Sequence, residues 1–227
     1  VKEVEPDKCK PLPNILNSSK EIDVLVLDFS KAFDTVPHQR LLQRLEFYGI
    51  RDSSLTWIEN WLCNRTQRVV VDGESAEEVQ VRSGVPQGTV LGPLLFLIYI
   101  NNIADDITST ARLFADDCLL YREVDSTNDS KCLQDDLDKF VAWSEMWQMS
   151  FNPDKCYSLR ISHKRKPEPK TYSMMGKSLA SVDHQPYLGV TIDKHISCNK
   201  HVDNATAKGN KMLGFARRNF GRCKQNV

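Results

Sequence analysis

The chain has 227 residues, of which 41% are hydrophobic and 26% are charged, and its formal net charge is zero. This length supports a hydrophobic core without disulfide staples, and the composition excludes collagen-like, low-complexity and wholly disordered chains. Seven cysteines are present without a CxxC pair, which disfavours a zinc site and predicts a reducing, intracellular location, in the nucleus, the cytoplasm or both.

Charge is divided unevenly along the chain. Residues 1–154 contain 15 Lys and Arg against 26 Asp and Glu, whereas residues 155–227 contain 15 against 4. The first part is acidic enough to attract metal cations, and the second is basic enough to contact nucleic-acid phosphates. A basic stretch is equally typical of a solvated helix without a ligand. The longest apolar run, 94–100, is far shorter than the roughly 20 residues of a membrane span, so we expect no membrane partner.

The first quarter of the chain predicts a loose lead-in, a buried strand and two helices. Residues 1–20 are polar and contain three prolines, which indicates a lead-in without regular structure. Residues 22–28 (IDVLVLD) are apolar enough for a strand buried on both faces, and the next helix runs from Pro37 to about Tyr48. A second helix begins at Asp52 or Ser53. Its apolar face, which we expect to be buried in the core, consists of Trp57, Ile58, Trp61 and Leu62.

The rest of the chain mixes short strands with helices. The expected strands are 69–71 and 79–82, a hairpin around Asp72-Gly73-Glu74, then the two arms of a tight hairpin over 111–121 (ARLFADDCLLY), and finally 156–161 and 187–192. The expected helices are 94–103, 129–147 and a basic stretch over 201–219, with loops at 83–92 and 164–170. Because strands and helices do not alternate regularly, the pattern favours an α+β fold over a doubly wound sheet.

Three carboxylates are candidates for a metal site. Asp28 ends the first strand, and Asp116 and Asp117 lie at the tip of the tight hairpin. Burying adjacent like charges raises a pKa unless a cation neutralises them, and Mg²⁺ is the simplest such cation. Two ions about 3.5–4 Å apart can hold the attacking and leaving oxygens of a phosphoryl transfer. Neighbouring strand residues point to opposite faces, so both hairpin acids serve one site only if the chain bends there. Without such a bend, they form a plain polar turn.

The three acids belong to a set of five segments that occur in a characteristic order along the chain. Together they resemble the reverse transcriptase domain of non-LTR retrotransposons, of the LINE-like, jockey-type group, over roughly residues 20–220. The matching segments are LDFSKAFDTVPH (27–38), SGVPQGTVLGPLLF (83–96), FADD (114–117), MSFNPDKC (149–156) and YLGV (187–190). Because the chain starts just before the first segment and stops early in the expected thumb, we expect an N-terminally truncated domain that has its acids but lacks part of its substrate clamp.

The resemblance implies an α+β fold, a right-hand polymerase palm with partial fingers and a partial thumb. We expect a lead-in without family match at 1–20, a palm with part of the fingers at 21–192, and the basic start of the thumb at 193–227. The fingers-like segment is about 37–82. The implied activity is RNA-directed DNA synthesis, in which two Mg²⁺ ions, with Mn²⁺ as a possible substitute, assist transfer of dNTPs to a primer 3′-hydroxyl. The implied partners are an RNA template and a DNA primer.

The resemblance also implies roles for single residues. Asp28 and Asp116 would bridge the two ions, with Asp117 as a more peripheral acid and Lys155 as the general acid for pyrophosphate. Phe29 would contribute a backbone carbonyl, and Phe33 would lie under the incoming sugar. The remaining implied contacts are nucleotide and template binding by Gln87 and Gly88, and a primer grip formed by Tyr187, Leu188 and Gly189.

Each of these roles has a plainer alternative. The alternative for Phe33 is a core residue, and the alternative for Lys155 is a surface lysine. Gln87 and Gly88 would otherwise belong to a plain loop, and the alternative for each of Tyr187, Leu188 and Gly189 is a buried strand end. We interpret Asp34 as a capping or hydrogen-bonding residue, not as a metal ligand. At the level of the whole chain, two alternatives remain. One is a catalytically inactive retrotransposon-derived remnant that at most binds nucleic acid through residues 155–227, and the other is a metal nuclease or phosphatase using the same acids.

Overall fold

The fold is built around one five-stranded sheet. The structure, a computed structural model, describes residues 21–162, 164, 170–197 and 199–220, so the expected lead-in and most of the loop at 164–170 lie outside it. In sheet order the strands are β11 (Ala180–Ser181), β8 (Tyr157–Ile161), β1 (Ile22–Asp28), β7 (Asp117–Glu123) and β6 (Thr110–Phe114). Neighbours are antiparallel except β11, which runs parallel to β8. The predicted α+β class is confirmed.

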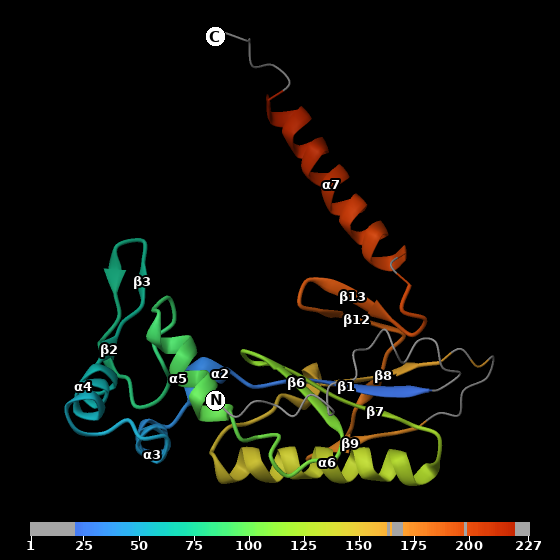
Figure 1. The fold of residues 1–227 in the computed structure, drawn as a ribbon. Coiled ribbons are helices and arrows are strands. Elements are labelled where there is room, and N and C mark those ends of the chain that lie inside the picture. The colour runs from blue at the N-terminus through green and yellow to red at the C-terminus, as the bar shows by residue number, and fades with distance from the viewer. Residues whose placement is uncertain (1–20, 163, 165–169, 198, 221–227) are drawn as a thin grey trace.

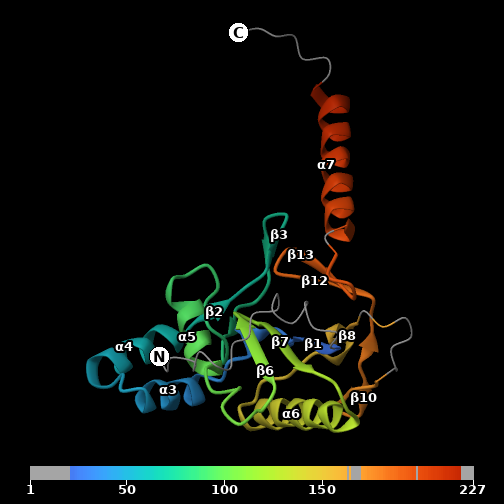
Figure 2. The ribbon, with the colours of Figure 1, turned by 45° about the vertical axis from the view of Figure 1, so that its right-hand side comes forward.

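Both faces of this sheet are covered. On one face, Leu25 and Leu27 of β1 join a core with α5 (Leu91–Ile100) and α6 (Thr127–Met146). On the other face, Val24 and Val26 belong to a smaller apolar cluster under the hairpin of β12 (His184–Tyr187) and β13 (Val190–Asp193). Figures 1 and 2 show α6 below the sheet and this hairpin above it. Burial on both sides explains why β1 is almost continuously apolar, as predicted.

A helical lobe stands beside the sheet. Its helices are α2 (Ala32–Thr35), α3 (His38–Phe47) and α4 (Asp52–Leu62), and its short strands are β2 (Thr66–Gln67), β3 (Val70–Val71), β4 (Glu74–Ser75) and β5 (Val79–Gln80). The predicted pairing of 69–71 with 79–82 is wrong, because β3 pairs with β4 and β2 with β5. Asp72 and Gly73 have φ of 51° and 89°, and such a two-residue turn closes the hairpin directly after Val71.

The expected burial of the α4 tryptophans is wrong for Trp57, whereas Trp61 is partly buried and packs against the core. Trp57 is 56% exposed and stacks on Trp61, with 6.4 Å between ring centroids. Only Ile58 and Leu62 of α4 are buried. Both face the core, with Trp61 at the edge of the same buried stripe, and Trp57 lies on the exposed side and stacks on Trp61.

Two predicted helices keep their type but change their ends. α5 begins at Leu91 instead of residue 94, which places Pro93 in the first turn, where no backbone N–H is needed. α6 begins at Thr127 because Ser126 and Asp129 form a reciprocal capping box. A short 3₁₀ turn, η2 (Pro153–Lys155), follows α6 and precedes β8, and a two-stranded piece pairs β9 (Ser173–Met174) with β10 (Lys177–Ser178).

The C-terminal part differs most from expectation. Residues 187–192 are not one strand, because the chain turns at Leu188 and Gly189, whose φ values are 47° and 80°. The glycine favours this turn, and the two arms become β12 and β13. The last element, α7 (Asn199–Phe220), confirms the predicted basic helix. It has no buried residue and projects away from the sheet in both views (Figures 1 and 2).

Candidate active site

Sheet register brings two of the three candidate acids together. Asp28, the last residue of β1, lies directly opposite Asp117, the first residue of β7. Side chains alternate along a strand, so Asp28 shares a face with Val24 and Val26, and Asp117 shares that face with Leu119. Opposite residues in an antiparallel pair have Cβ atoms about 5 Å apart. The two carboxylates therefore extend the face that the β12–β13 hairpin covers.

The third acid arrives through a strained turn. Phe114 lies opposite Asp117, which leaves Ala115 and Asp116 as the two-residue loop between β6 and β7. Ala115 has φ of 52°, in the left-handed region that costs an L-residue roughly 1–2 kcal/mol. This bend is the condition under which both neighbouring acids can serve one site.

The three acids form a region of unbalanced negative charge. Burial, and then the charges of Asp116 and Asp28, raise the pKa of Asp117. The Oδ2 atom of Asp28 is itself buried and accepts no hydrogen bond. Hard divalent cations prefer such carboxylate oxygens, so these donors fit Mg²⁺ or Mn²⁺. No three His, Cys, Asp or Glu side chains of the described residues form a ready-made metal site, so a bound ion would need further oxygens from water or phosphate.

The segment around Lys155 is tied to the end of β1. The Ser30 N–H donates to the Ser150 carbonyl at 2.7 Å, and the Asn152 N–H donates to the Asp28 carbonyl at 2.8 Å. Lys155 follows in η2, and its Nζ lies 3.5 Å from Asp28 Oδ2 while the side chain stays 65% exposed. The structure thus places Lys155 beside the acids, on an otherwise open surface.

Phe29 is fixed between these two segments. Its ring stacks on that of Phe151 at 4.2 Å, and the two residues form an isolated antiparallel bridge. The bonds that flank this bridge come from Asp28 and Ser30, not from Phe29. In an antiparallel pair, this pattern points the Phe29 carbonyl toward the opposite edge, which is the side of β7.

The glycine-containing loop is fastened to α2. The Val85 N–H donates to the Phe33 carbonyl at 2.7 Å, and the Gly84 N–H donates to the Val36 carbonyl at 2.8 Å. A Cβ atom on Gly84 would lie 2.7 Å from the Asp34 carbonyl oxygen, and its φ of 89° also favours glycine. This close approach fixes the loop against the helix that follows β1.

The side chains of this loop and of α2 meet at its tip. Gln87 Nε2 donates to Asp34 Oδ1 at 3.1 Å, so Asp34 acts as a hydrogen-bond acceptor. Phe33 is half-buried and stacks on Phe96 at 4.5 Å, while Gly88 is exposed with φ of 76°. An open cavity of about 1130 Å³ lies beside Asp34 and Gln87.

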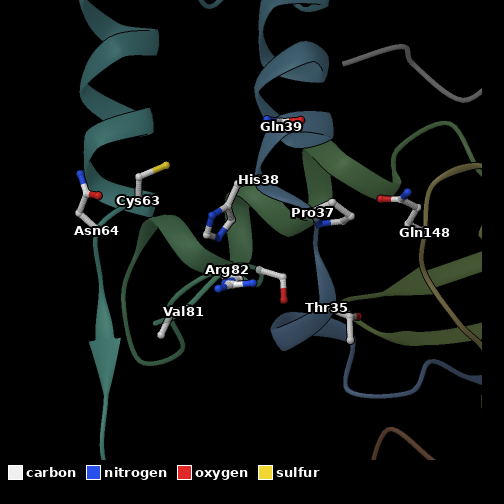
Figure 3. A pocket seen from close by; sticks show the side chains of 10 residues that line it. Thr35, Pro37, His38, Gln39, Cys63, Asn64, Val81, Arg82 and Gln148 are labelled. Carbon is white, nitrogen blue, oxygen red and sulfur yellow. The ribbon is translucent and has the colours of Figure 1, made fainter. Parts of the chain in front are cut away.

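A second cavity, of about 580 Å³, was not foreseen from the sequence (Figure 3). His38, at the start of α3, is buried, and its Nε2 lies 2.8 Å from the Gly84 carbonyl oxygen. Cys63 and Asn64 follow α4 on the other side, and Arg82 lies below the imidazole (Figure 3). The side chains come from segments that are distant in sequence, so no local sequence pattern predicts this cavity.

One side chain of the β12–β13 hairpin, Tyr187, lies near the acids. Burial, and then the nearby Cys118 and Asp117, raise the pKa of Tyr187 to about 12, with Arg112 acting in the opposite direction. Tyr187 is therefore close to Asp117. Leu188 and Gly189 form the turn beyond it, and Leu188 is exposed.

Comparison with known proteins decides the family. Residues 6–192 match the profile of the family described as "Reverse transcriptase (RNA-dependent DNA polymerase)". The chain belongs to the reverse transcriptase family. The match begins at residue 6, inside the segment for which we expected no family likeness.

Curated relatives place the chain among retrotransposon reverse transcriptases. It is 29% identical over 188 residues to the RNA-directed DNA polymerase from mobile element jockey of Drosophila melanogaster, covering 78% of this chain and 20% of that protein. It is 29% identical over 209 residues to the Pol polyprotein from the type-1 retrotransposable element R2 of Popillia japonica, covering 82% and 33%. The chain thus spans a fifth to a third of these relatives and represents part of a reverse transcriptase region. The predicted resemblance to non-LTR elements is confirmed.

Solved structures support the same fold. A telomerase from Candida tropicalis, solved with the TWJ fragment of telomeric RNA, matches with a TM-score of 0.54 over 80% of this chain and 30% of that one. A form truncated from its C-terminal domain matches with a TM-score of 0.51. Sequence identity is 11% in both cases, so the likeness concerns the fold, and it confirms the right-hand polymerase class. Among the described helices, none combines the length and the apolar character that crossing a membrane requires.

Proposed function

We propose that this reverse transcriptase region is the catalytic part of an RNA-directed DNA polymerase, which extends a DNA primer along an RNA template with dNTPs. The observation that carries this proposal is the position of Asp28 directly opposite Asp117, with Asp116 in the adjoining turn and close enough for its charge to raise the pKa of Asp117. The names of the retrotransposon relatives support the reaction class.

The three acids would hold two Mg²⁺ ions, with Mn²⁺ as a possible substitute. Asp28 and Asp116 would be the main ligands of these ions, and Asp117 would be the more peripheral one. Two observations support this assignment. The buried Asp28 Oδ2 accepts no hydrogen bond, and the exposed Lys155 is its one ion-pair partner among the described residues. The pKa of Asp117 is raised by burial and by the negative charges of Asp116 and Asp28. Such ions neutralise the oxygens that attack and leave during phosphoryl transfer. The direction of the Phe29 carbonyl is consistent with a further oxygen ligand on the same side.

Lys155 donates a proton to the leaving group. The primer 3′-hydroxyl gives up its proton to water and its oxygen bonds to the α-phosphorus. The bond from that phosphorus to the bridging oxygen of pyrophosphate breaks, and Lys155 Nζ–H protonates the departing oxygen. Its ion pair with Asp28 keeps the ammonium beside the site, and its 65% exposure leaves it free to reach a nucleotide.

Other side chains select and align the substrates. Phe33 lies under the incoming sugar and disfavours a 2′-hydroxyl, while Gln87 and Gly88 line the nucleotide and template pocket. Tyr187, Leu188 and Gly189 grip the primer, which is supported by the proximity of Tyr187 to Asp117.

The proposed subdomains of the polymerase hand occupy successive segments of the chain. The palm with part of the fingers spans 21–192, with the fingers-like segment at about 37–82, and the thumb begins at 193–227. Residues 1–20 form the lead-in. The location we propose is the nucleus, the cytoplasm or both.

Primer extension tests the proposed function. With an RNA template, a DNA primer, dNTPs and Mg²⁺, the wild-type chain and an Asp125→Ala control, whose side chain is exposed, should extend the primer. Asp116→Ala should show no metal-dependent extension. Equal extension by Asp116→Ala would contradict the assignment.

If the folded wild-type chain extends no primer, the result would favour the alternative that the chain is a catalytically inactive remnant. In that case residues 155–227 would at most bind nucleic acid electrostatically. The affinity of such binding falls steeply between about 50 and 200 mM salt.

A further inference from the structure

Arg44, in the middle of α3, is a buried cation, 7% exposed, that forms no ion pair among the described residues. Burial lowers its pKa, and the charge of Asp105, beyond ion-pair distance, acts in the opposite direction. The Nε atom of Arg44 is buried and has no hydrogen-bond partner. Burying a cation without a paired anion is costly, and an apolar residue of similar length usually serves stability as well or better. The position of Arg44 therefore calls for a reason other than stability.

The contacts that Arg44 does make join three separate elements. Its Nη2 donates to Asn102 Oδ1, beyond the end of α5, at 2.7 Å. Its guanidinium carbon lies 3.7 Å from the ring centroid of Trp147, directly after α6. A planar guanidinium stacks on an aromatic face in a defined orientation, which a lysine ammonium does not.

Trp147 is held by further contacts in the same cluster. The Tyr99 hydroxyl donates to the Trp147 carbonyl, and the two rings meet edge to face at 5.6 Å. Trp143 Nε1 donates at 3.0 Å to the same Asn102 oxygen that Arg44 contacts. Both the ring and the backbone of Trp147 are thus fixed relative to α3 and α5.

Five residues after Trp147, the chain reaches Asn152, which hydrogen-bonds to the backbone of Asp28. Gln148 has a φ of 54°, and the Met149 N–H donates to the Ser144 carbonyl at 2.8 Å, so the turn is tightly defined. Residues 150–152 then pair with the end of β1 through the two backbone bonds described above, and Lys155 follows. A shift of Trp147 therefore displaces the segment that flanks Asp28.

In the other direction, α3 is connected to the glycine-containing loop. His38, at the start of α3, contacts the Gly84 carbonyl, and that loop carries Gln87. Figure 1 shows α6 ending on the side of the sheet where α3 lies. One rigid helix thus links the loop at one end to the Trp147 cluster along its length.

We propose that Arg44 is a positioning residue that, by stacking on Trp147, aligns the helical lobe with the Asp28–Lys155 side of the site. This inference rests on the proposed polymerase function, but it also predicts a structural effect that needs no activity. Arg44→Met keeps the apolar stem and removes the planar cation. A residue required only for stability would change the melting temperature without a selective effect at Lys155.

Two readouts test the proposal, with Arg51→Met as the matched control because Arg51 is exposed at the start of α4. The first is acylation of individual lysines followed by mass spectrometry. In folded Arg44→Met, labelling of Lys155 should rise about threefold, the size expected when an exposed ion pair is lost, and other described lysines should not change. The second is single-nucleotide extension. Arg44→Met should lower kcat at least about tenfold while KM for the dNTP stays within about twofold.

Two further variants keep the test decisive. Arg44→Lys keeps the charge without the planar stack, so it should remain folded and show the same changes in weaker form. Trp147→Phe should resemble Arg44→Met, and the double variant should add no further effect on Lys155. Unchanged Lys155 labelling in both folded Arg44 variants overturns the proposal. Altered labelling in a chain whose wild type extends no primer supports the positioning role and counts against the proposed function alone.

Discussion

The acid site and helix α7 are built in opposite ways. Asp28 and Asp117 owe their proximity to strand register, and the strands that carry them are buried on both faces. α7 has 22 residues and none is buried. The sheet therefore holds the two acids in place by its own pairing, whereas α7 is held at its start by contacts of His201 and Asn204 with Thr191 and otherwise exposes its surface. Substitutions in the sheet should therefore change the free energy of unfolding strongly, and substitutions on α7 should change it little.

The largest contrast is expected for two leucines. Leu120→Ala, in the fully buried centre of β7, should lower the free energy of unfolding by about 4 kcal/mol through lost burial and a cavity. Leu213→Ala, on a side chain of α7 that is 50% exposed, should change it by less than about 0.5 kcal/mol. Denaturant unfolding of both variants measures the difference, and similar losses would contradict the comparison.

A buried carboxylate that supports the palm comes next. Asp136 of α6 accepts hydrogen bonds from the Thr108 and Ser109 N–H groups at 3.1 and 2.7 Å, next to the start of β6. Asp136→Ala should cost about 3 kcal/mol, because these donors lose their acceptor in the interior. The exposed neighbour Asp135→Ala is the control, and thermal or denaturant unfolding measures both.

The same carboxylate predicts an acid limit to stability. Burial alone would raise the pKa of Asp136, but hydrogen bonds from Lys139, Ser109 and Thr108 outweigh it and lower the pKa. Its contribution is therefore present above the unfolded pKa of about 3.9 and is lost as pH falls through the lower folded value. Unfolding measured from pH 5 downward should show less acid sensitivity in Asp136→Ala than in the wild type. Equal acid sensitivity would contradict the pKa assignment.

At the acid site, stability should depend on pH in the opposite direction, because the pKa of Asp117 is raised and not lowered. The raised pKa of Asp117 means that its favourable contribution is present below the unfolded pKa and is lost as pH rises through the folded value. Asp117→Asn should therefore stabilise the metal-free chain at pH 7 by up to about 1 kcal/mol. Mg²⁺ should raise the melting temperature of the wild type more than that of this variant. A destabilised Asp117→Asn without metal would contradict the proposed charge repulsion.

The smallest effect concerns the turn that carries Asp116. Ala115→Gly removes the left-handed strain, but it also increases the entropy of the unfolded chain, so the net gain should be at most about 0.5 kcal/mol. Ala142→Gly, at an exposed position inside α6, should instead cost about 1 kcal/mol. Melting curves of the two variants separate the special backbone of the turn from a general effect of glycine.

Sequence reasoning identified the parts of the molecule whose signals are local. The buried β1, the hairpin tip at Asp116 and the helix α6 are all encoded by short apolar or polar patterns. The pairing of β3 with β4 and the division of 187–192 into two strands depend on backbone angles at Asp72 and Gly189, which an apolar pattern does not reveal. The roles suggested for Lys155 and Phe33 came from family resemblance and remain proposals.

The Arg44–Trp147 stack could not be predicted in this way. In the sequence, Arg44 is one more charge on an amphipathic helix, and Trp147 is one more apolar residue at the end of the predicted helix 129–147. Their contact arises from the packing of elements about a hundred residues apart in the chain. The same holds for His38 and Gly84, whose contact links a helix start to a distant loop.

The most direct test of a metal site at Asp28, Asp116 and Asp117 is Mn²⁺ binding, measured by electron paramagnetic resonance in the presence of a template–primer and a dNTP. Asp28→Asn and Asp116→Asn should each weaken Mn²⁺ binding by at least about tenfold, as expected when one carboxylate ligand of a divalent ion is lost. Asp154→Ala, which removes an exposed acid of η2 paired with Lys177, should bind Mn²⁺ like the wild type. Wild-type affinity in Asp28→Asn would contradict the claim that these acids form one metal-dependent site.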